Sequence, residues 1–193
     1  LFEDIPSGQR FLTTIIEAMR DGLTIMLTYQ SFSRNEPSTF EVHPYCVKVF
    51  KQRWYLVAYS PWYDDMRIYA LDRVEAVETS ETTFKLPKNF DAKEYFADSF
   101  GIIVDEENYK VEHIEIKVAA GQREYFRPLP LHPSQHEIET ANDFSVFAFC
   151  LRPTFDFQQE LRRYGAAVEV LSPAWLRDEM AAEIKRATEL YER

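Results

Sequence analysis

The chain has 193 residues with a formal net charge of −10 at pH 7, and 46% of its residues are hydrophobic. This length fits one large domain or two small ones, and the apolar content suffices for a core and is too high for a disordered chain. The acidic charge argues against a general binder of duplex nucleic acid, because domains that grip phosphates are usually basic overall.

The first half of the chain is predicted to form one helix and five short strands. Ser7 can cap the helix, whose apolar residues recur at helical spacing until Asp21-Gly22 ends it. Pro44 lies inside the second strand and predicts an edge or a bulge there, because proline cannot donate to the ladder. Five strands with tight turns indicate a small barrel. We expect these strands over residues 23–32, 39–50, 53–59, 66–71 and 73–78.

The second half changes to an alternation of helices and strands. A helix is expected from Asp91 to Gly101, and a domain boundary near Asp105. The order that follows, strand, helix, strand, strand, helix, strand, is that of a ferredoxin-like sandwich. Ser172-Pro173 is predicted to start a last helix, with the serine as cap and the proline at its first position. We therefore expect an α+β protein with a leading helix at 1–22, a barrel domain with a capping helix at 23–104 and a sandwich domain at 105–193.

No catalytic constellation emerges from the sequence. His132 and His136 are four residues apart, but Pro130 and Pro133 break any helix that would align them. Ordinary loop histidines are therefore favoured over a metal site. The chain has no glycine-rich phosphate loop and no serine in an elbow motif. We expect no enzyme, no metal and no cofactor.

The cysteines and the hydropathy pattern indicate the compartment. Cys46 and Cys150 sit among apolar neighbours and are interpreted as two buried free thiols, rather than a disulfide or a metal pair. Sparse cysteine suits a reducing cytosol. No segment approaches the apolar length of a membrane span, and no signal peptide is visible. We expect a cytoplasmic protein without a membrane partner.

One group of side chains on the predicted barrel suggests a binding site. Arginine offers planar, bidentate donors suited to phosphate or carboxylate. Tyrosine and histidine can stack on a base and also form hydrogen bonds. Because the strands of a small barrel bring such residues within reach of one another, the sequence predicts an anion site with an aromatic lining. Its candidate residues are Tyr29, Ser31, Arg34, His43, Tyr55, Arg67 and Arg73.

The first half of the chain resembles the WYL domain, a regulatory module of bacterial transcription factors. The segments Trp54-Tyr55-Leu56 and Leu71-Asp72-Arg73-Val74 carry the resemblance, together with Tyr29, the His43-Pro44-Tyr45 strand and Arg67. These positions appear in the expected order over about Ala18 to Phe90. The resemblance implies an Sm-like, SH3-type barrel, and it implies that the seven candidate residues bind an effector.

The second half is similar to the C-terminal extension called WCX that often follows a WYL domain. Tyr164-Gly165, the segment from Val168 to Pro173 and Trp175-Leu176-Arg177 carry this similarity, which covers about Glu112 to Arg193. The family implies a transcription regulator whose effector is anionic, either a nucleotide or single-stranded nucleic acid. It also implies a homodimer. Effector binding would shift the equilibrium between two arrangements of this dimer.

Family members usually bind operator DNA through an N-terminal winged helix-turn-helix. This chain begins with Leu1 rather than Met and has no segment resembling a recognition helix. We therefore expect a fragment that lacks the DNA-binding domain, and expect operator binding only through that absent part.

Two other functions stay open at this point. In a non-sensing oligomerisation module the aromatic faces would be interfaces, and Arg73 would pair with Asp72 or a nearby glutamate. In a metal-dependent phosphodiesterase, the acidic loop Asp64-Asp65 would hold the metal, although the sequence offers no ligand set with convincing spacing.

Overall fold

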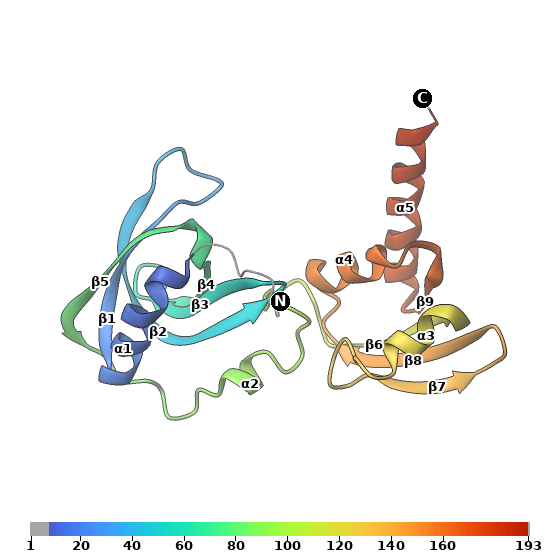
Figure 1. Cartoon of the computed structure of the whole chain (residues 1–193), viewed down its shortest axis with the longest axis horizontal. Helices are drawn as coiled ribbons and strands as arrows, with labels where there is room; N and C mark the ends of the chain where they lie inside the picture. Colours follow the sequence, from blue (N-terminus) through green and yellow to red (C-terminus); the bar gives the residue numbers. More distant parts are fainter. Residues whose placement is uncertain (1–7, 193) are drawn as a thin grey trace. The chain divides into compact units, whose positions relative to one another are not determined.

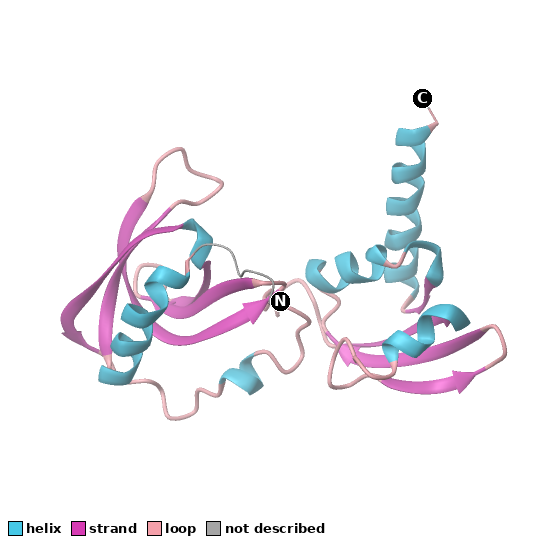
Figure 2. Ribbon diagram, viewed as in Figure 1, coloured by secondary structure: helices cyan, strands magenta, loops and turns pink. Residues whose placement is uncertain are grey.

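The computed structural model describes residues 8–192. The chain divides into two compact units, one up to Ala92 and one from Lys93 (Figure 1). Each unit contains one antiparallel sheet with helices, so the expected α+β class is confirmed (Figure 2). Ser7, the predicted helix cap, lies outside the described residues. The three domain ranges expected from the sequence stay predictions.

The first unit begins with helices and continues with five strands, as the sequence predicts. Its helix ends where expected, because Gly22 adopts the left-handed conformation that terminates helices, with φ of 66°. The elements are η1 (Gln9–Phe11), α1 (Leu12–Asp21), β1 (Leu23–Tyr29), β2 (Ser38–Phe50), β3 (Arg53–Ser60), β4 (Asp65–Ala70), η2 (Leu71–Arg73) and β5 (Val74–Thr83).

The long strand β2 organises the first sheet, whose strand order is β4-β3-β2-β1-β5. Its first part pairs with β1, from Ser38 to Val42, and its second part pairs with β3. The register shifts between Pro44 and Cys46, which confirms the predicted bulge and bends the strand. Within residues 8–192 no ladder joins β4 to β5, so the sheet is open by its hydrogen bonds. The Sm-like, SH3-type barrel stays a prediction.

Helix α1 packs on this sheet through its apolar side. Ile15 and Ala18 of α1 are buried in one cluster with Ile25, Leu27 and residues of the other strands. Full burial of each large aliphatic side chain contributes about 1.5–3 kcal/mol, so this cluster holds the helix against the sheet. The helix is therefore part of the first unit's core.

The second unit shows the predicted alternation of strands and helices. Its sheet has the order β7-β8-β6-β9, and all its pairs are antiparallel. The ferredoxin-like assignment stays a prediction. The elements are α2 (Ala92–Tyr95), which spans the boundary, then β6 (Glu112–Ala119), α3 (Ala120–Phe126), β7 (His136–Thr140), β8 (Phe144–Leu151), α4 (Phe155–Arg163), η3 (Gly165–Ala167), β9 (Val168–Ser172) and α5 (Ala174–Tyr191).

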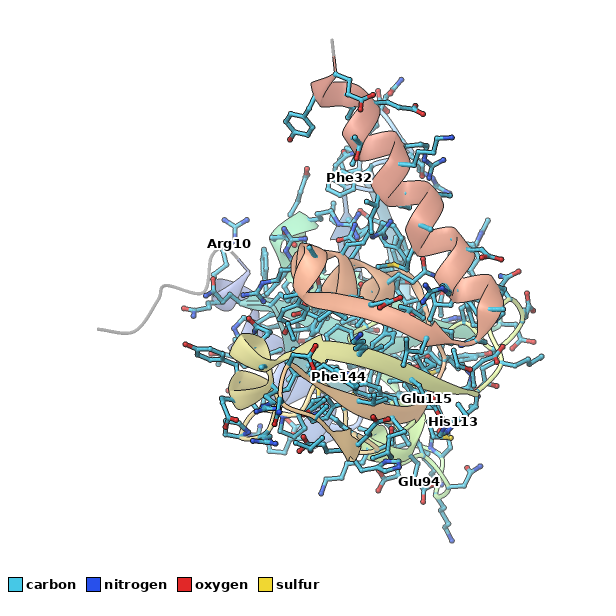
Figure 3. All side chains as sticks on the ribbon, turned by 90° about the vertical axis from the view of Figure 1, so that its right-hand side faces the viewer. Arg10, Phe32, Glu94, His113, Glu115 and Phe144 are labelled. Carbon is cyan, nitrogen blue, oxygen red and sulfur yellow. The ribbon has the colours of Figure 1, made fainter. Side chains whose placement is uncertain are left out.

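Strand β6 shows why this sheet has one buried and one open face. Ile114 and Ile116 are fully buried, whereas His113 is exposed and Glu115 is half-buried on the opposite face. The His113 Nε2 and Glu115 Oε1 atoms lie 3.0 Å apart, and Figure 3 labels both side chains. Cys150 pairs with His113 in the ladder and is exposed as well, so its predicted burial is wrong. Cys46 is half-buried, and both thiols are free.

Two predicted helix limits are also wrong. The helix expected from Asp91 to Gly101 is only the four-residue α2, because the chain beyond it is tied to the end of β8: the Arg152 N–H donates to the Asp98 carbonyl at 2.7 Å. Ser172 does not cap α5, because it pairs with β6 as the last residue of β9. No helix in the described part of the chain is long and apolar enough to cross a membrane.

Candidate functional site

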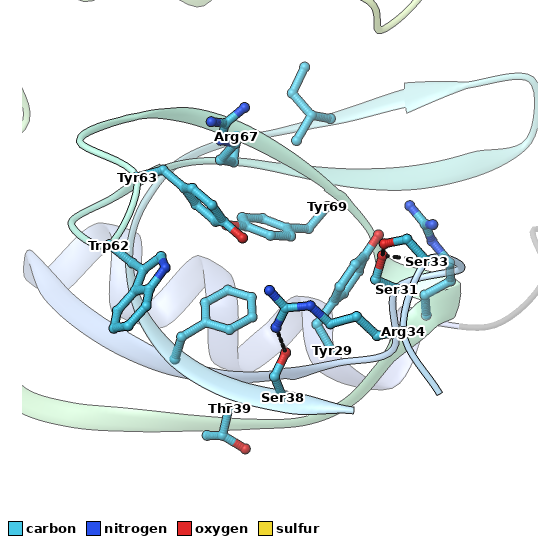
Figure 4. A pocket seen from close by; sticks show the side chains of 13 residues that line it. Tyr29, Ser31, Ser33, Arg34, Ser38, Thr39, Trp62, Tyr63, Arg67 and Tyr69 are labelled. Carbon is cyan, nitrogen blue, oxygen red and sulfur yellow. Dashed lines mark hydrogen bonds between the residues drawn. The ribbon is translucent and has the colours of Figure 1, made fainter. Parts of the chain in front are cut away.

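A pocket of about 600 Å³ opens on the first unit (Figure 4). Its walls come from the end of β1, the loop at residues 30–37, the start of β2, the β3–β4 turn, β4 and η2. The volume lies within the roughly 300–1,000 Å³ typical of small-molecule sites. Its lining residues are Tyr29, Ser31, Ser33, Arg34, Ser38, Thr39, Phe40, Trp62, Tyr63, Arg67, Ile68, Tyr69 and Arg73.

The structure brings five of the seven predicted site residues together in this pocket and leaves two outside its lining. His43 instead stacks on Phe84, with ring centroids 5.2 Å apart. Tyr55 is buried in β3. The five lining residues are Tyr29, Ser31, Arg34, Arg67 and Arg73.

Two tyrosines form the buried part of the pocket. The rings of Tyr29 and Tyr69 meet edge to face, with centroids 5.2 Å apart, and both residues are less than 8% exposed. Burial raises the pKa of Tyr29 above its usual 10 and the pKa of Tyr69 to about 12. Both phenols are therefore neutral at physiological pH and can donate a hydrogen bond. The Tyr69 hydroxyl lies near Ser60, yet it makes no well-formed hydrogen bond with a described residue.

Arg34 is held so that its guanidinium points into the middle of the pocket (Figure 4). Its Nη1 donates to Ser38 Oγ at 3.2 Å. Its backbone carbonyl accepts a hydrogen bond from the Gln30 side chain at 2.6 Å, which fixes the loop. These bonds leave most of the guanidinium donors of Arg34 available to a ligand.

Arg73 lies between two aromatic rings. Its guanidinium carbon is 4.9 Å from the ring centroid of Tyr29 and 4.4 Å from that of Phe32. Its Nε is buried and has no hydrogen-bond partner among residues 8–192. The competing interpretation paired Arg73 with Asp72, but the Asp72 carboxylate makes its ion pair with Arg53 at 3.2 Å.

Arg67 contributes a third cation, partly balanced by its own strand. Its guanidinium lies 4.6 Å from the ring centroid of Tyr63, and its Nη2 lies 3.5 Å from Asp65 Oδ2. That ion pair is largely exposed, so water screens it. Among the described lining residues three are arginines and none is acidic. The pocket is thus a local positive site, suited to an anion with oxygen acceptors, on a protein of net charge −10.

The aromatic residues of the β3–β4 turn were missed by reasoning from the sequence. Trp62 is 81% exposed and Tyr63 is 47% exposed, and both line the pocket. Exposed apolar surface that gathers at one place on a protein often marks a binding site. The Trp62-Tyr63 pair, set between Pro61 and Asp64, is the signal that could have identified them.

The acidic loop considered for a metal is engaged in internal contacts. Asp64 accepts a hydrogen bond from the Tyr59 hydroxyl, and Asp65 accepts one from the Met66 N–H at 2.7 Å. In the described part of the chain, no group of three or more His, Cys, Asp or Glu side chains could hold a metal ion. His132 is buried, with its Nδ1 and Nε2 hydrogen-bonded to the Ser134 hydroxyl and a backbone carbonyl.

Comparison with protein families assigns both halves of the chain. The model of the WYL domain family matches residues 10–79, a range that contains every described lining residue of the pocket. The model of the WCX domain family matches residues 110–188.

Curated relatives match over most of the chain. The protein PafB of Mycobacterium tuberculosis and that of Mycobacterium bovis are each 27% identical over 180 residues, or 90% of this chain. The match covers 52% of each relative, so the chain spans about half the length of the curated relatives it matches.

Two solved structures are also similar. Proteasome accessory factor B/C of Arthrobacter aurescens is 20% identical, with a TM-score of 0.39 over 96% of this chain and 28% of its own. A CRISPR Cas-related protein is 15% identical, with a TM-score of 0.51 over 94% of this chain and 51% of its own, which shows a shared fold.

Proposed function

Because this chain contains a WYL domain and a WCX domain, we propose that it is the effector-sensing part of a transcription regulator. The effector is an anion, either a nucleotide or single-stranded nucleic acid. One observation carries the proposal: three arginines and exposed aromatic rings line a single pocket whose described lining has no carboxylate. Similarity to PafB over most of the chain supports a regulatory role.

Each part of the pocket has a role in this proposal. Arg34 and Arg73 hold phosphate oxygens by charge-assisted hydrogen bonds. The neutral phenols of Tyr29 and Tyr69 donate further hydrogen bonds. Trp62 offers an exposed face on which a base can stack, whatever its identity. Arginines that bind phosphate beside aromatic rings that stack on bases are typical of sites for single-stranded nucleic acid.

Close packing links the pocket to the start of the first helix. A Cβ atom on Gly8 would lie 2.5 Å from Leu71 Cβ, so the backbone before η1 lies directly against η2. Arg73 is the last residue of η2, and its carbonyl accepts a hydrogen bond from the Gln30 N–H at 3.0 Å. A ligand that moves Arg73 would therefore press on the segment that leads into α1.

This packing suggests how binding reaches DNA. We propose that a DNA-binding domain elsewhere in a longer, PafB-like protein responds to that segment. We further propose a homodimer whose two arrangements differ in affinity for the effector. The strand orders support assignment of the two units to an Sm-like, SH3-type barrel and a ferredoxin-like sandwich.

Fluorescence anisotropy with a labelled ten-nucleotide single strand tests the sensor proposal. We expect binding that weakens as salt rises, because each phosphate contact releases counterions. Arg73→Ala and Arg34→Ala should each weaken binding at least tenfold. Arg20→Ala is the matched control, since Arg20 is 67% exposed on α1, pairs with Asp21 and does not line the pocket. Equal binding by all three folded variants would refute the proposal.

Self-association without sensing is a second candidate, and the last turns of α5 favour it. Only Leu176 and Met180 of this helix are buried, whereas Ile184, Leu190 and Tyr191 are each at least 52% exposed. An exposed apolar stripe of this kind is a common dimer surface. Sedimentation velocity of the wild type and Ile184→Lys tests this candidate; a dimer that the substitution dissociates, with no anion binding, would favour it.

A further inference from the structure

We infer that the pocket prefers a phosphate monoester, the phosphorylated end of a nucleotide chain, over the phosphodiesters inside it. This inference rests on the proposed function, because it names the group that the same pocket holds. It adds a prediction that the proposed function does not make: the chemical nature of the strand end controls affinity.

The charge of the pocket matches a dianion. Arg34 and Arg73 have no carboxylate partner among the described residues, and only Arg67 shares its charge, with Asp65. About two positive charges therefore remain uncompensated. A phosphate monoester carries roughly −1.5 to −2 at pH 7, whereas a phosphodiester carries a single negative charge. A diester would leave one guanidinium without a counter-charge inside the pocket.

The pocket also has more hydrogen-bond donors than the two non-bridging oxygens of a diester can accept. Arg73 Nε and the Tyr69 hydroxyl are buried and have no hydrogen-bond partner within residues 8–192. Arg34 presents further N–H groups, and the hydroxyls of Ser31 and Ser33, 2.9 Å apart, line another side of the same pocket (Figure 4). A terminal phosphate offers three strong acceptor oxygens to such a set, one more than the two non-bridging oxygens of a diester.

The exposure of the rings gives the strand a direction. Tyr29 and Tyr69 are buried, whereas Trp62 is 81% exposed and Phe32 is 85% exposed. The phosphate end therefore lies against the buried tyrosines, and the first base stacks on an exposed ring. A pocket of about 600 Å³ accommodates a ligand the size of roughly one nucleotide, so the rest of the strand leaves towards solvent.

Calorimetric titration of the whole chain with unlabelled ten-nucleotide strands of one sequence tests this inference. The strands carry a 5′-phosphate, a 3′-phosphate or hydroxyls at both ends, and 5′-dTMP and inorganic phosphate are titrated separately. We expect one phosphorylated strand to bind at least tenfold tighter than the hydroxyl strand. Tight binding of 5′-dTMP as well would identify a mononucleotide as the source of the monoester. Equal binding of all three strands overturns the inference but keeps the proposed function, and no binding of any ligand overturns both.

The pH dependence of binding and two substitutions test the same inference independently. The second pKa of a phosphate monoester is about 6, so the advantage of the phosphorylated strand should shrink several-fold from pH 7.5 to pH 5.5. The lining contains no histidine or carboxylate among its described residues, and the nearby Asp65 and Asp72 are ion-paired. The hydroxyl strand controls for other effects of pH. Arg34→Gln should reduce the ratio of the two affinities towards one, whereas Trp62→Ala should weaken both strands and preserve the ratio.

Discussion

Asp72 forms its ion pair with Arg53, at 3.2 Å from Nε to Oδ2, and not with its neighbour Arg73. The two arginines therefore have different roles. Arg53 neutralises the Asp72 carboxylate, whereas Arg73 lies between two aromatic rings and faces the pocket. The difference matters for binding, because a guanidinium already paired with a carboxylate attracts an anionic ligand only weakly. Arg73 has no such partner among the described residues and remains available to a ligand.

Arg53→Ala should weaken anion binding although Arg53 does not line the pocket. The substitution leaves the Asp72 carboxylate, which is only 20% exposed, without its ion-pair partner and adjacent in sequence to Arg73, so its charge is free to compete with the ligand for Arg73. We expect a several-fold loss of affinity for a single strand, measured by anisotropy. The free energy of unfolding should fall by about 1 kcal/mol or less, because Arg53 is half-exposed. Arg53→Lys should retain most of the binding, and unchanged affinity in Arg53→Ala would contradict the pairing argument.

Gly8→Ala should lower both stability and affinity. The φ of Gly8 is 101°, and an added Cβ would lie 2.5 Å from Leu71 Cβ, so η2 must shift. Strain of this kind costs about 1–3 kcal/mol in the free energy of unfolding, measured by urea denaturation. Because η2 ends at Arg73, we also expect weaker anion binding. The matched control is Gly121→Ala in α3, where no atom lies within 4 Å of the new Cβ and the substitution should be neutral or stabilising.

Local patterns were enough to predict most of the architecture. The period-two alternation, the Asp21-Gly22 helix end and Pro44 in a strand each have a local physical cause, and each element appears where expected. The resemblance to the WYL and WCX domains is confirmed by the family matches. The helix expected from Asp91 is shorter than predicted. Its capping pattern could not reveal that the distant Arg152 N–H donates to the carbonyl of Asp98 in the following segment.

The pocket was predictable only in part, because strand order does not determine which face a side chain joins. Arg34, Arg67 and Arg73 line one pocket, since the ends of neighbouring strands bring them together; their role in binding stays a prediction. His43 was grouped with them because its ring can stack on a base and form hydrogen bonds, but the bulge at Pro44 follows it and its ring stacks on Phe84. That contact comes from a segment beyond β5, which no local pattern reveals.

Acid should destabilise the second unit through one ion pair. Hydrogen bonds from Arg127 lower the pKa of Glu137 from its usual 4.5 to about 2. A carboxylate with a depressed folded pKa stabilises the fold fully above its unfolded pKa, and this stabilisation is lost as pH falls from about 4.5 to about 2. Urea denaturation at pH 5 and pH 3 should show the loss. Glu137→Gln should be less stable at pH 5 and less sensitive to this change, and an identical pH dependence in both proteins would contradict the assignment.

Trp62→Ala should separate ligand stacking from folding. The ring is 81% exposed, so its removal should change the free energy of unfolding by less than about 0.5 kcal/mol. Stacking of one base on an aromatic ring contributes about 1–3 kcal/mol, so affinity for a single strand should fall by about 5- to 150-fold. In the wild type, a bound base should quench the fluorescence of Trp62, and the variant should lose that quenching. Trp175→Phe is the control, because Trp175 belongs to α5, donates to Glu112 and is not one of the residues that line the pocket. Full affinity in Trp62→Ala would mean that the phosphate contacts act alone and that the exposed ring serves another partner.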